Sequence, residues 1–106
     1  MKGFGGIQQL MKQANQMQLK MKKLQEEFAT REFTASSGGG AVEVTVIGES
    51  QVKSIVINKD VFVDGDAEML QDMVVLATND ALAKAKEEYR LATEKITGGI
   101  GLPGMM

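Results

Sequence analysis

Residues 7–28 read IQQLMKQANQMQLKMKKLQEEF, and apolar side chains recur in this stretch at alternating spacings of three and four. Such a heptad pattern predicts a helix with a narrow apolar stripe of the kind that a second helix covers in a coiled coil. A chain of this size has little else to cover the stripe, so we expect the second helix to come from another copy of the chain. The predicted dimer interface consists of Ile7, Leu10, Ala14, Met17, Met21, Leu24 and Phe28. The flanking charges are too few to fix whether the two helices run parallel or antiparallel.

The length and composition indicate one small domain, residues 1–106, with a modest core. The chain has four Phe, one Tyr and no Trp, so few large side chains are present to fill a core. We expect the glycine-rich segments 1–6 and 98–106 to be flexible. No stretch approaches the roughly 20 apolar residues that span a bilayer, and the first residues lack a secretory core. We therefore expect a cytoplasmic protein with no membrane partner.

The heptad helix is predicted to run from Ile7 to about Glu32, after which the periodicity changes. Residues 33–36 favour a strand, residues 38–40 are three glycines, and residues 41–47 alternate between apolar and polar. This alternation predicts a half-buried strand with Val42, Val44 and Val46 on its inner face. Residues 48–51 are typical of a hairpin turn, and residues 52–57 form the next predicted strand.

A second long helix is predicted after Asp64-Gly65-Asp66, because an aspartate there caps a helix and suits its positive end. Its apolar stripe consists of Leu70, Val74, Ala77, Ala81, Ala85 and Ala92. The helix should end near Ile96, before Gly98 and Gly99. The fold class is therefore α+β, a helix followed by a three-stranded antiparallel meander and a second helix.

Positive charge is concentrated at the start of the chain although the net charge is −2. Five lysines and no acid occur in the first 25 residues, whereas residues 60–80 contain six acids and no base. A doubled basic helix in a dimer suits a polyanion, because affinity for DNA rises steeply with the number of phosphates neutralised. The alternative is that the lysines are only the solvated face of a helix. No zinc module, stacking aromatics or Arg- and Asn-rich recognition helix is apparent. We therefore expect any DNA binding to rely mainly on contacts to the phosphate backbone of the DNA, with weak sequence specificity.

Enzymatic chemistry has little support in this sequence. Histidine and cysteine are both absent, which removes the usual proton shuttle, the strongest nucleophile and thiolate metal sites. The acidic group Asp60, Asp64, Asp66 and Glu68 is better interpreted as a loop and a helix start than as paired catalytic carboxylates. Glycines 38–40 lead into a strand and not a helix, which argues for a turn and against a phosphate loop. We expect no catalytic site, no metal and no cofactor.

Several segments, which follow one another in the same order as in the family, resemble the YbaB/EbfC family of bacterial nucleoid-associated proteins. They include residues 10–18 and 20–27, glycines 38–40 leading into residues 42–46, and residues 68–74 with 77–81. The resemblance implies a homodimer in which a joined central sheet carries projecting helices, and binding to double-stranded DNA in the nucleoid. On this chain the implied DNA-binding residues are the basic positions Lys12, Lys20, Lys22, Lys23, Lys84, Lys86, Arg90 and Lys95.

A role in nucleoid organisation and in gene regulation also follows from the resemblance. The competing hypothesis is a coiled-coil adaptor that recruits a protein partner, which the apolar stripe and the acidic segment 60–80 favour. Reversing the charge of Lys20, Lys22 and Lys23 distinguishes the two hypotheses. A DNA-binding protein should lose its affinity for DNA, whereas an adaptor should still bind its protein partner.

Overall fold

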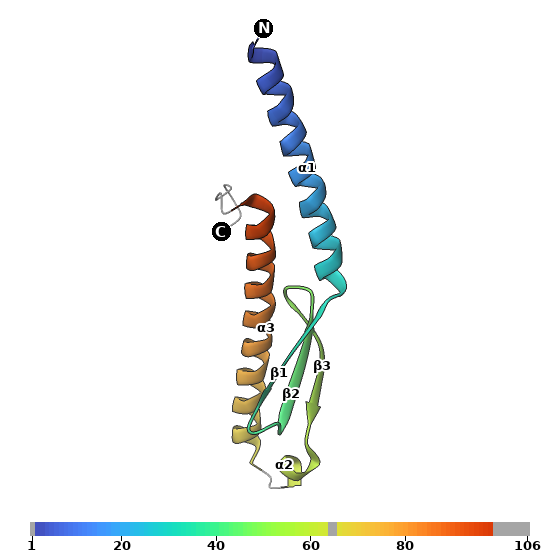
Figure 1. Ribbon diagram of the computed structural model, residues 1–106. Helices are drawn as coiled ribbons and strands as arrows, with labels where there is room; N and C mark the ends of the chain where they lie inside the picture. The colour runs from blue at the N-terminus through green and yellow to red at the C-terminus, as the bar shows by residue number, and fades with distance from the viewer. Residues whose placement is uncertain (1, 64–65, 99–106) are drawn as a thin grey trace.

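The computed structural model describes residues 2–63 and 66–98 and confirms the predicted order of helix, three strands and helix (Figure 1). The elements are α1 (Lys2–Thr30), β1 (Glu32–Ser37), β2 (Val42–Ile47), β3 (Gln51–Ile57), α2 (Lys59–Val63) and α3 (Ala67–Thr97). The short helix α2 was not predicted. The molecule is elongated, with extents of 77 × 20 × 18 Å, because the two long helices lie nearly along one axis. Within the described ranges, no helix combines the length and apolar character that a membrane crossing requires.

Helix α1 is longer at its start and shorter at its end than the sequence predicts. It begins at Lys2, so residues 2–6, which were expected to be flexible, lie in the helix. The strong helix formers that follow carry the helix through Gly5 and Gly6 despite the cost of glycine. It ends at Thr30, and Glu32, predicted to be helical, instead begins β1. The predicted flexibility of residues 99–106 concerns a segment outside the described residues.

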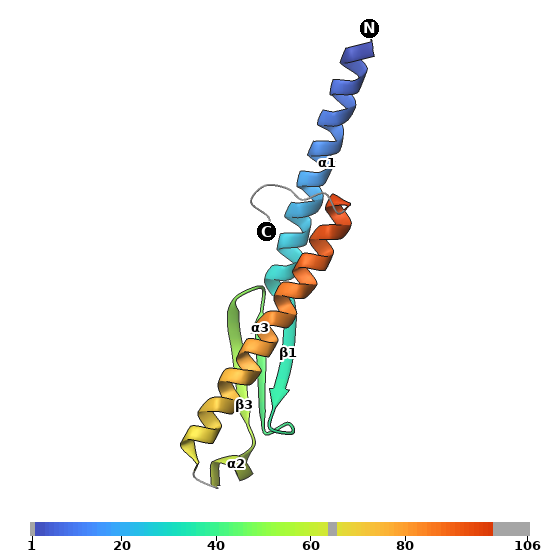
Figure 2. The same cartoon turned by 90° about the vertical axis from the view of Figure 1, so that its left-hand side faces the viewer.

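The three strands form an antiparallel sheet in the order β1-β2-β3. The predicted alternation on β2 is confirmed, since Val42, Val44 and Val46 are fully buried and Glu43 is exposed. Helix α3 lies across this apolar face, over β1 and β2 (Figure 2). A bulge between Thr45 and Val46 shifts the pairing with β3.

The apolar face of the sheet continues onto β3, where it is left uncovered. Directly paired residues share a face of the sheet, and Val42, Val44 and Val46 pair with Ile57, Ile55 and Val52 of β3. All seven residues of β3 are nevertheless exposed, and Ile55 retains 44% of its accessible surface. Among the residues that the structure describes, β3 therefore has no partner on its outer side, and it is an edge strand whose apolar side chains face solvent.

Helix α3 has the predicted caps and the predicted apolar stripe. The side chain of Asp66 accepts a hydrogen bond of 2.9 Å from the backbone N–H of Met69, and Gly98 ends the helix in the left-handed conformation. Ala77, Ala81 and Ala85 are fully buried, and Leu70, Val74 and Ala92 are partly buried around them. Because alanine is small, the backbone of α3 can approach the sheet closely.

The apolar stripe of α1 is covered along only part of its length. Phe28 and Leu24 are 3% and 7% exposed and belong to the core with α3 and the sheet. Met21 and Met17 are half-buried, whereas Leu10 and Ile7 are 66% and 57% exposed. The chain's own fold thus covers the end of the stripe, and the first half of α1 projects beyond α3 (Figures 1 and 2).

Candidate nucleic-acid interface

The predicted DNA-binding residues of α1 are all exposed. They are Lys12 in the projecting half of the helix, and Lys20, Lys22 and Lys23 in its middle. Glutamine and asparagine fill most of the polar positions between them, so no acid precedes Glu26. The helix therefore presents four described lysines, and the only carboxylates near them in the helix are those of Glu26 and Glu27, which follow Lys22 and Lys23 by one turn.

These lysines are also free of the ion pairs that other cations form. Among residues 2–63 and 66–98, salt bridges engage Arg31, Lys53 and Arg90, and none engages the four α1 lysines. An incoming phosphate would not have to displace a carboxylate from them. When lysine ammonium groups bind DNA phosphates, they release the counterions condensed on the DNA, which favours binding.

The predicted basic residues of α3 are exposed as well, but acids accompany them. The Arg90 guanidinium donates hydrogen bonds to Glu87 at 2.7 and 3.0 Å and to Glu94 at 3.3 Å. The hydrogen bond from Arg90 lowers the pKa of Glu87 below its ordinary value of 4.5, and Glu87 in turn raises the pKa of Arg90. The charge of Arg90 is therefore largely compensated within α3.

The other three cations of α3 differ in their surroundings. Lys84 Nζ lies 3.4 Å from the backbone carbonyl oxygen of Thr34 on β1, which directs it toward the sheet. Lys86 and Lys95 remain exposed. Of the two helices, α1 thus offers the stronger electrostatic attraction to a polyanion.

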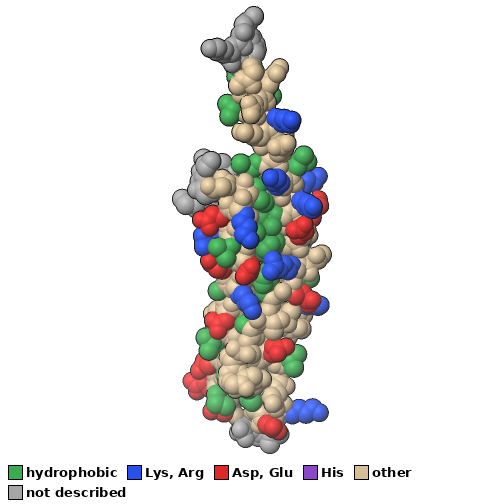
Figure 3. Space-filling model, viewed as in Figure 1, with side chains coloured by type: hydrophobic (Ala, Val, Ile, Leu, Met, Phe, Trp, Pro, Cys, Tyr) green, Lys and Arg blue, Asp and Glu red, His purple; other side chains and the backbone are tan. Residues whose placement is uncertain are grey.

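The fold brings the basic stretches of the two helices side by side. Helices α1 and α3 run antiparallel, so the middle of α1 lies next to the end of α3 (Figure 1). In Figure 3, Lys and Arg side chains gather on both sides of an apolar strip that runs between these helices. Acidic side chains are more frequent at the opposite end of the molecule, where the acidic segment 60–80 lies.

Arg31 is a cation at this surface that the sequence reasoning missed. It is the single residue between α1 and β1, and its guanidinium lies 5.1 Å from the ring centre of Phe28 and 5.0 Å from that of Phe33. It also pairs with Glu88 of α3 at 3.7 Å. The flanking phenylalanines at positions −3 and +2 were the available signal, because a planar guanidinium stacks well on aromatic rings.

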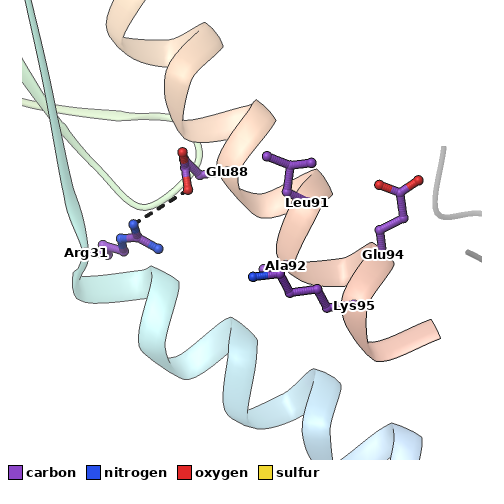
Figure 4. Close-up of a pocket in the computed structure, with 6 residues that line it drawn as sticks. All are labelled: Arg31, Glu88, Leu91, Ala92, Glu94 and Lys95. Atoms are coloured by element: carbon purple, nitrogen blue, oxygen red, sulfur yellow. Dashed lines mark ion pairs between the residues drawn. The ribbon is translucent and has the colours of Figure 1, made fainter. Parts of the chain in front are cut away.

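An open hollow of about 620 Å³ lies beside Arg31, between the end of α1 and α3 (Figure 4). Its lining consists of Arg31, Glu88, Leu91, Ala92, Glu94 and Lys95. Two cations and two acids line it together with apolar side chains, and it is widely open to solvent. Such a surface is suited to contact with a large partner more than to enclosing a small molecule.

The acidic group has the structural role that the sequence favoured, as far as it is described. Asp66 caps α3, and the backbone N–H of Asp60 donates to the Asn58 side chain at 2.9 Å. Asp64 lies outside the described residues. In the ranges that the structure covers, no three acidic side chains converge as metal ligands would.

Comparison with known proteins gives a consistent result. Residues 2–100 match the family model described as the YbaB/EbfC DNA-binding family. A nucleoid-associated protein of Clostridium novyi is 48% identical over 106 residues, which cover 97% of this chain and 93% of that protein. A nucleoid-associated protein of Clostridium acetobutylicum is 44% identical over 103 residues, covering 97% of this chain and 92% of the relative.

A solved structure shares the fold. The crystal structure of an uncharacterized protein from Helicobacter pylori superposes with a TM-score of 0.70 and covers 92% of this chain and 97% of that one. Its sequence identity is 22%, so this likeness concerns the architecture alone.

Proposed function

Because this chain belongs to the YbaB/EbfC DNA-binding family, we propose that it acts as a homodimer that binds duplex DNA mainly through phosphate contacts from its basic helix faces. Nucleoid association is the function named for its relatives, and the family is one of DNA-binding proteins and not of enzymes. The finer statements, namely the dimer, the phosphate contacts and a role in nucleoid organisation and gene regulation, are our proposal. The proposed location is the nucleoid, within the cytoplasm.

One observation carries the proposal. Lys12, Lys20, Lys22 and Lys23 are exposed on α1 and take no part in the ion pairs of the described residues. A dimer doubles this surface, and each further phosphate contact adds to an affinity that depends steeply on salt. Lys84, Lys86, Arg90 and Lys95 add a second, weaker contribution from α3, since acids lie beside them.

The proposed dimer has two candidate contacts, both of them apolar surfaces that the described residues of the single chain leave open. One is the uncovered part of the heptad stripe, at Ile7, Leu10 and Ala14. The other is the edge strand β3, where pairing with a second β3 would join two sheets and shelter Ile55 and Ile57. The remaining predicted interface residues, Met17, Met21, Leu24 and Phe28, contribute progressively less, because the chain's own fold covers them.

The test is fluorescence anisotropy of a labelled DNA duplex, titrated with the protein at several salt concentrations. We expect affinity to fall steeply as salt rises, and the triple variant Lys20→Gln/Lys22→Gln/Lys23→Gln to bind more weakly. Its log–log salt slope should be shallower by about 0.9 for each phosphate that the variant no longer neutralises. Lys59→Gln, in α2 at the opposite end of the molecule, is the control and should match the unmodified protein.

A protein that causes no anisotropy change at the lowest salt would contradict the proposal. That result would favour the adaptor hypothesis, for which the acidic end of α3 is the supporting feature. Met69, Val75 and Leu76 are exposed there among acidic side chains, as a docking surface for a basic partner would require. A triple variant that binds like the unmodified protein would place the phosphate contacts elsewhere.

A further inference from the structure

The first half of α1 carries a narrow apolar stripe that no other described residue of the chain covers. We call residues 5–18 the arm. Ile7, Leu10 and Met11 are exposed on it, whereas Leu24 and Phe28 of the same helix are buried against α3. In Figures 1 and 2 the arm extends beyond the end of α3. The heptad spacing continues without a break from the covered part into the arm.

The polar residues of the arm suit pairing with an identical arm. In the heptad that starts at Ile7, the positions beside the stripe are occupied by Met11, Gln13 and Gln18, none of which is charged. Lys12, the one charged residue of the arm, occupies the position opposite the stripe. Two arms can therefore pack together without burying a charge or placing like charges against each other. The lysine would remain outside and available to phosphate.

The direction of such pairing follows from where α3 ends. A parallel partner would continue along the stripe toward Leu24 and Phe28, which α3 already covers. An antiparallel partner overlaps the arm alone, over about 21 Å of helix at 1.5 Å per residue, and its own body lies at the far end. In that arrangement Leu10 of one arm faces Ala14 of the other, and Ile7 faces Met17. The Leu10 layer then joins a large side chain to a small one, and the flexible Met17 side chain can adapt to Ile7.

The arm is separate from the other apolar surface of the molecule. The edge strand β3 lies in the half of the molecule away from the arm, and no residue belongs to both (Figure 1). A contact through one surface leaves the other open. A protomer with two different two-fold contacts builds assemblies larger than a dimer.

We propose that the arm pairs antiparallel with the arm of a second copy, in addition to the sheet-edge contact, so that dimers are linked into larger assemblies. This inference rests on the proposed homodimer but not on DNA binding. With Lys12, Lys20, Lys22 and Lys23 outside the paired stripe, a linked assembly presents several basic surfaces at once and can hold separate DNA segments together.

The first test is molar mass by light scattering across a range of protein concentrations, without DNA. We expect the unmodified protein to pass from two protomers to four and more. The double variant Ile7→Gln/Leu10→Gln should remain a dimer, and any larger species should need a protein concentration about tenfold higher or more. The reason is that each arm then has two fewer apolar side chains to bury. Leu19→Gln is the matched control, since Leu19 is 68% exposed on the same helix but lies opposite the stripe.

The sheet-edge contact is removed separately with Ile55→Lys. That variant should retain a dimer through the arms, and combining it with Ile7→Gln/Leu10→Gln should give monomers. Larger assemblies that persist in Ile7→Gln/Leu10→Gln would overturn the inference, as would a monomeric Ile55→Lys. Circular dichroism of each variant checks that the fold is retained.

The second test concerns direction and uses the natural lack of cysteine. Leu10→Cys and Ala14→Cys variants are oxidised alone and as a mixture. Antiparallel pairing predicts a disulfide-linked species that forms mainly in the mixture, whereas efficient linking of Leu10→Cys to itself would overturn that direction. DNA binding is measured on the same variants, so that a failure of the arm contact is distinguished from a failure of the proposed function. A dimer that binds DNA normally but never assembles further would refute only the arm contact.

Discussion

The guanidinium of Arg31 stacks over the ring of Phe28, 5.1 Å from its centre, at the point where α1 turns into the sheet. Phe28 also stacks on Phe33 at 5.9 Å and meets Tyr89 of α3 edge to face at 5.2 Å. Three elements thus converge on one aromatic cluster that Arg31 covers from outside. The direction in which α1 leaves the body of the molecule is set at this junction.

Stacking should matter more than the ion pair at Arg31. Arg31→Lys keeps the charge but loses the planar group over Phe28 and Phe33, and we expect the free energy of unfolding to fall by about 0.5–1 kcal/mol. Glu88→Gln should change it little, because the paired side chains are 50% and 43% exposed and such pairs contribute weakly. Urea denaturation at a fixed protein concentration measures both. A larger loss for Glu88→Gln than for Arg31→Lys would contradict this ranking.

The turn between β1 and β2 allows a matched comparison of two glycines. Gly38 and Gly39 have φ of +63° and +67°, a region that costs other residues about 1–2 kcal/mol. A Cβ at Gly38 would also collide with the Met73 side chain of α3, whereas one at Gly39 meets open space. We therefore expect Gly38→Ala to lower the thermal midpoint more than Gly39→Ala. Equal midpoints would show that Met73 moves aside without cost.

Removing acids from the end of α3 should strengthen DNA binding. Glu87 and Glu94 hold Arg90 in ion pairs and repel phosphates nearby. Glu87→Gln/Glu94→Gln frees that guanidinium, and each acid removed at ~10 Å from a phosphate should raise affinity about twofold in low salt. Anisotropy titrations measure the change, with Asp72→Asn toward the other end of α3 as the control. Unchanged affinity would argue that α3 lies away from the DNA.

The pairing of Glu87 with Arg90 predicts a pH dependence confined to acid. Since the folded pKa of Glu87 is lowered, the stabilisation by this pair is present above its ordinary value of 4.5 and is lost as pH falls through the folded pKa. Titration of the Glu87 carboxyl carbon by NMR should show a midpoint below that value. In Arg90→Gln the midpoint should move back up, and an unmoved midpoint would assign the shift to another group.

The sequence predicted the covered parts of this fold well. The alternation of Val42, Val44 and Val46 and the stripe of Ala77, Ala81 and Ala85 are confirmed, because burial against the chain's own core imposes a period on both. On β3 the three consecutive apolar residues Ile55, Val56 and Ile57 show no alternation, so the sequence did not indicate which side of the strand faces the core. The reason is physical, since in the single chain both sides of that strand are open to solvent.

Short elements and packed cations were harder to predict. Helix α2 has five residues, too few to show a helical period, and its presence depends on how the chain returns toward α3. The basic positions of α1 could be chosen from charge alone, and their role in DNA binding stays a prediction. Arg31 was missed because counting charges does not identify a guanidinium that is held by aromatic rings.

The uneven covering of α1 means that one continuous helix contains two regions of different local stability. An isolated helix of fewer than about 12–15 residues is marginal in water, so the projecting half depends on the packed half for its order. Backbone amides near Leu10 should then exchange with solvent through fraying, while those near Phe28 exchange only when the core opens. Any partner that binds the projecting half would also order it as a helix. The free-energy cost of that ordering would reduce the observed binding affinity.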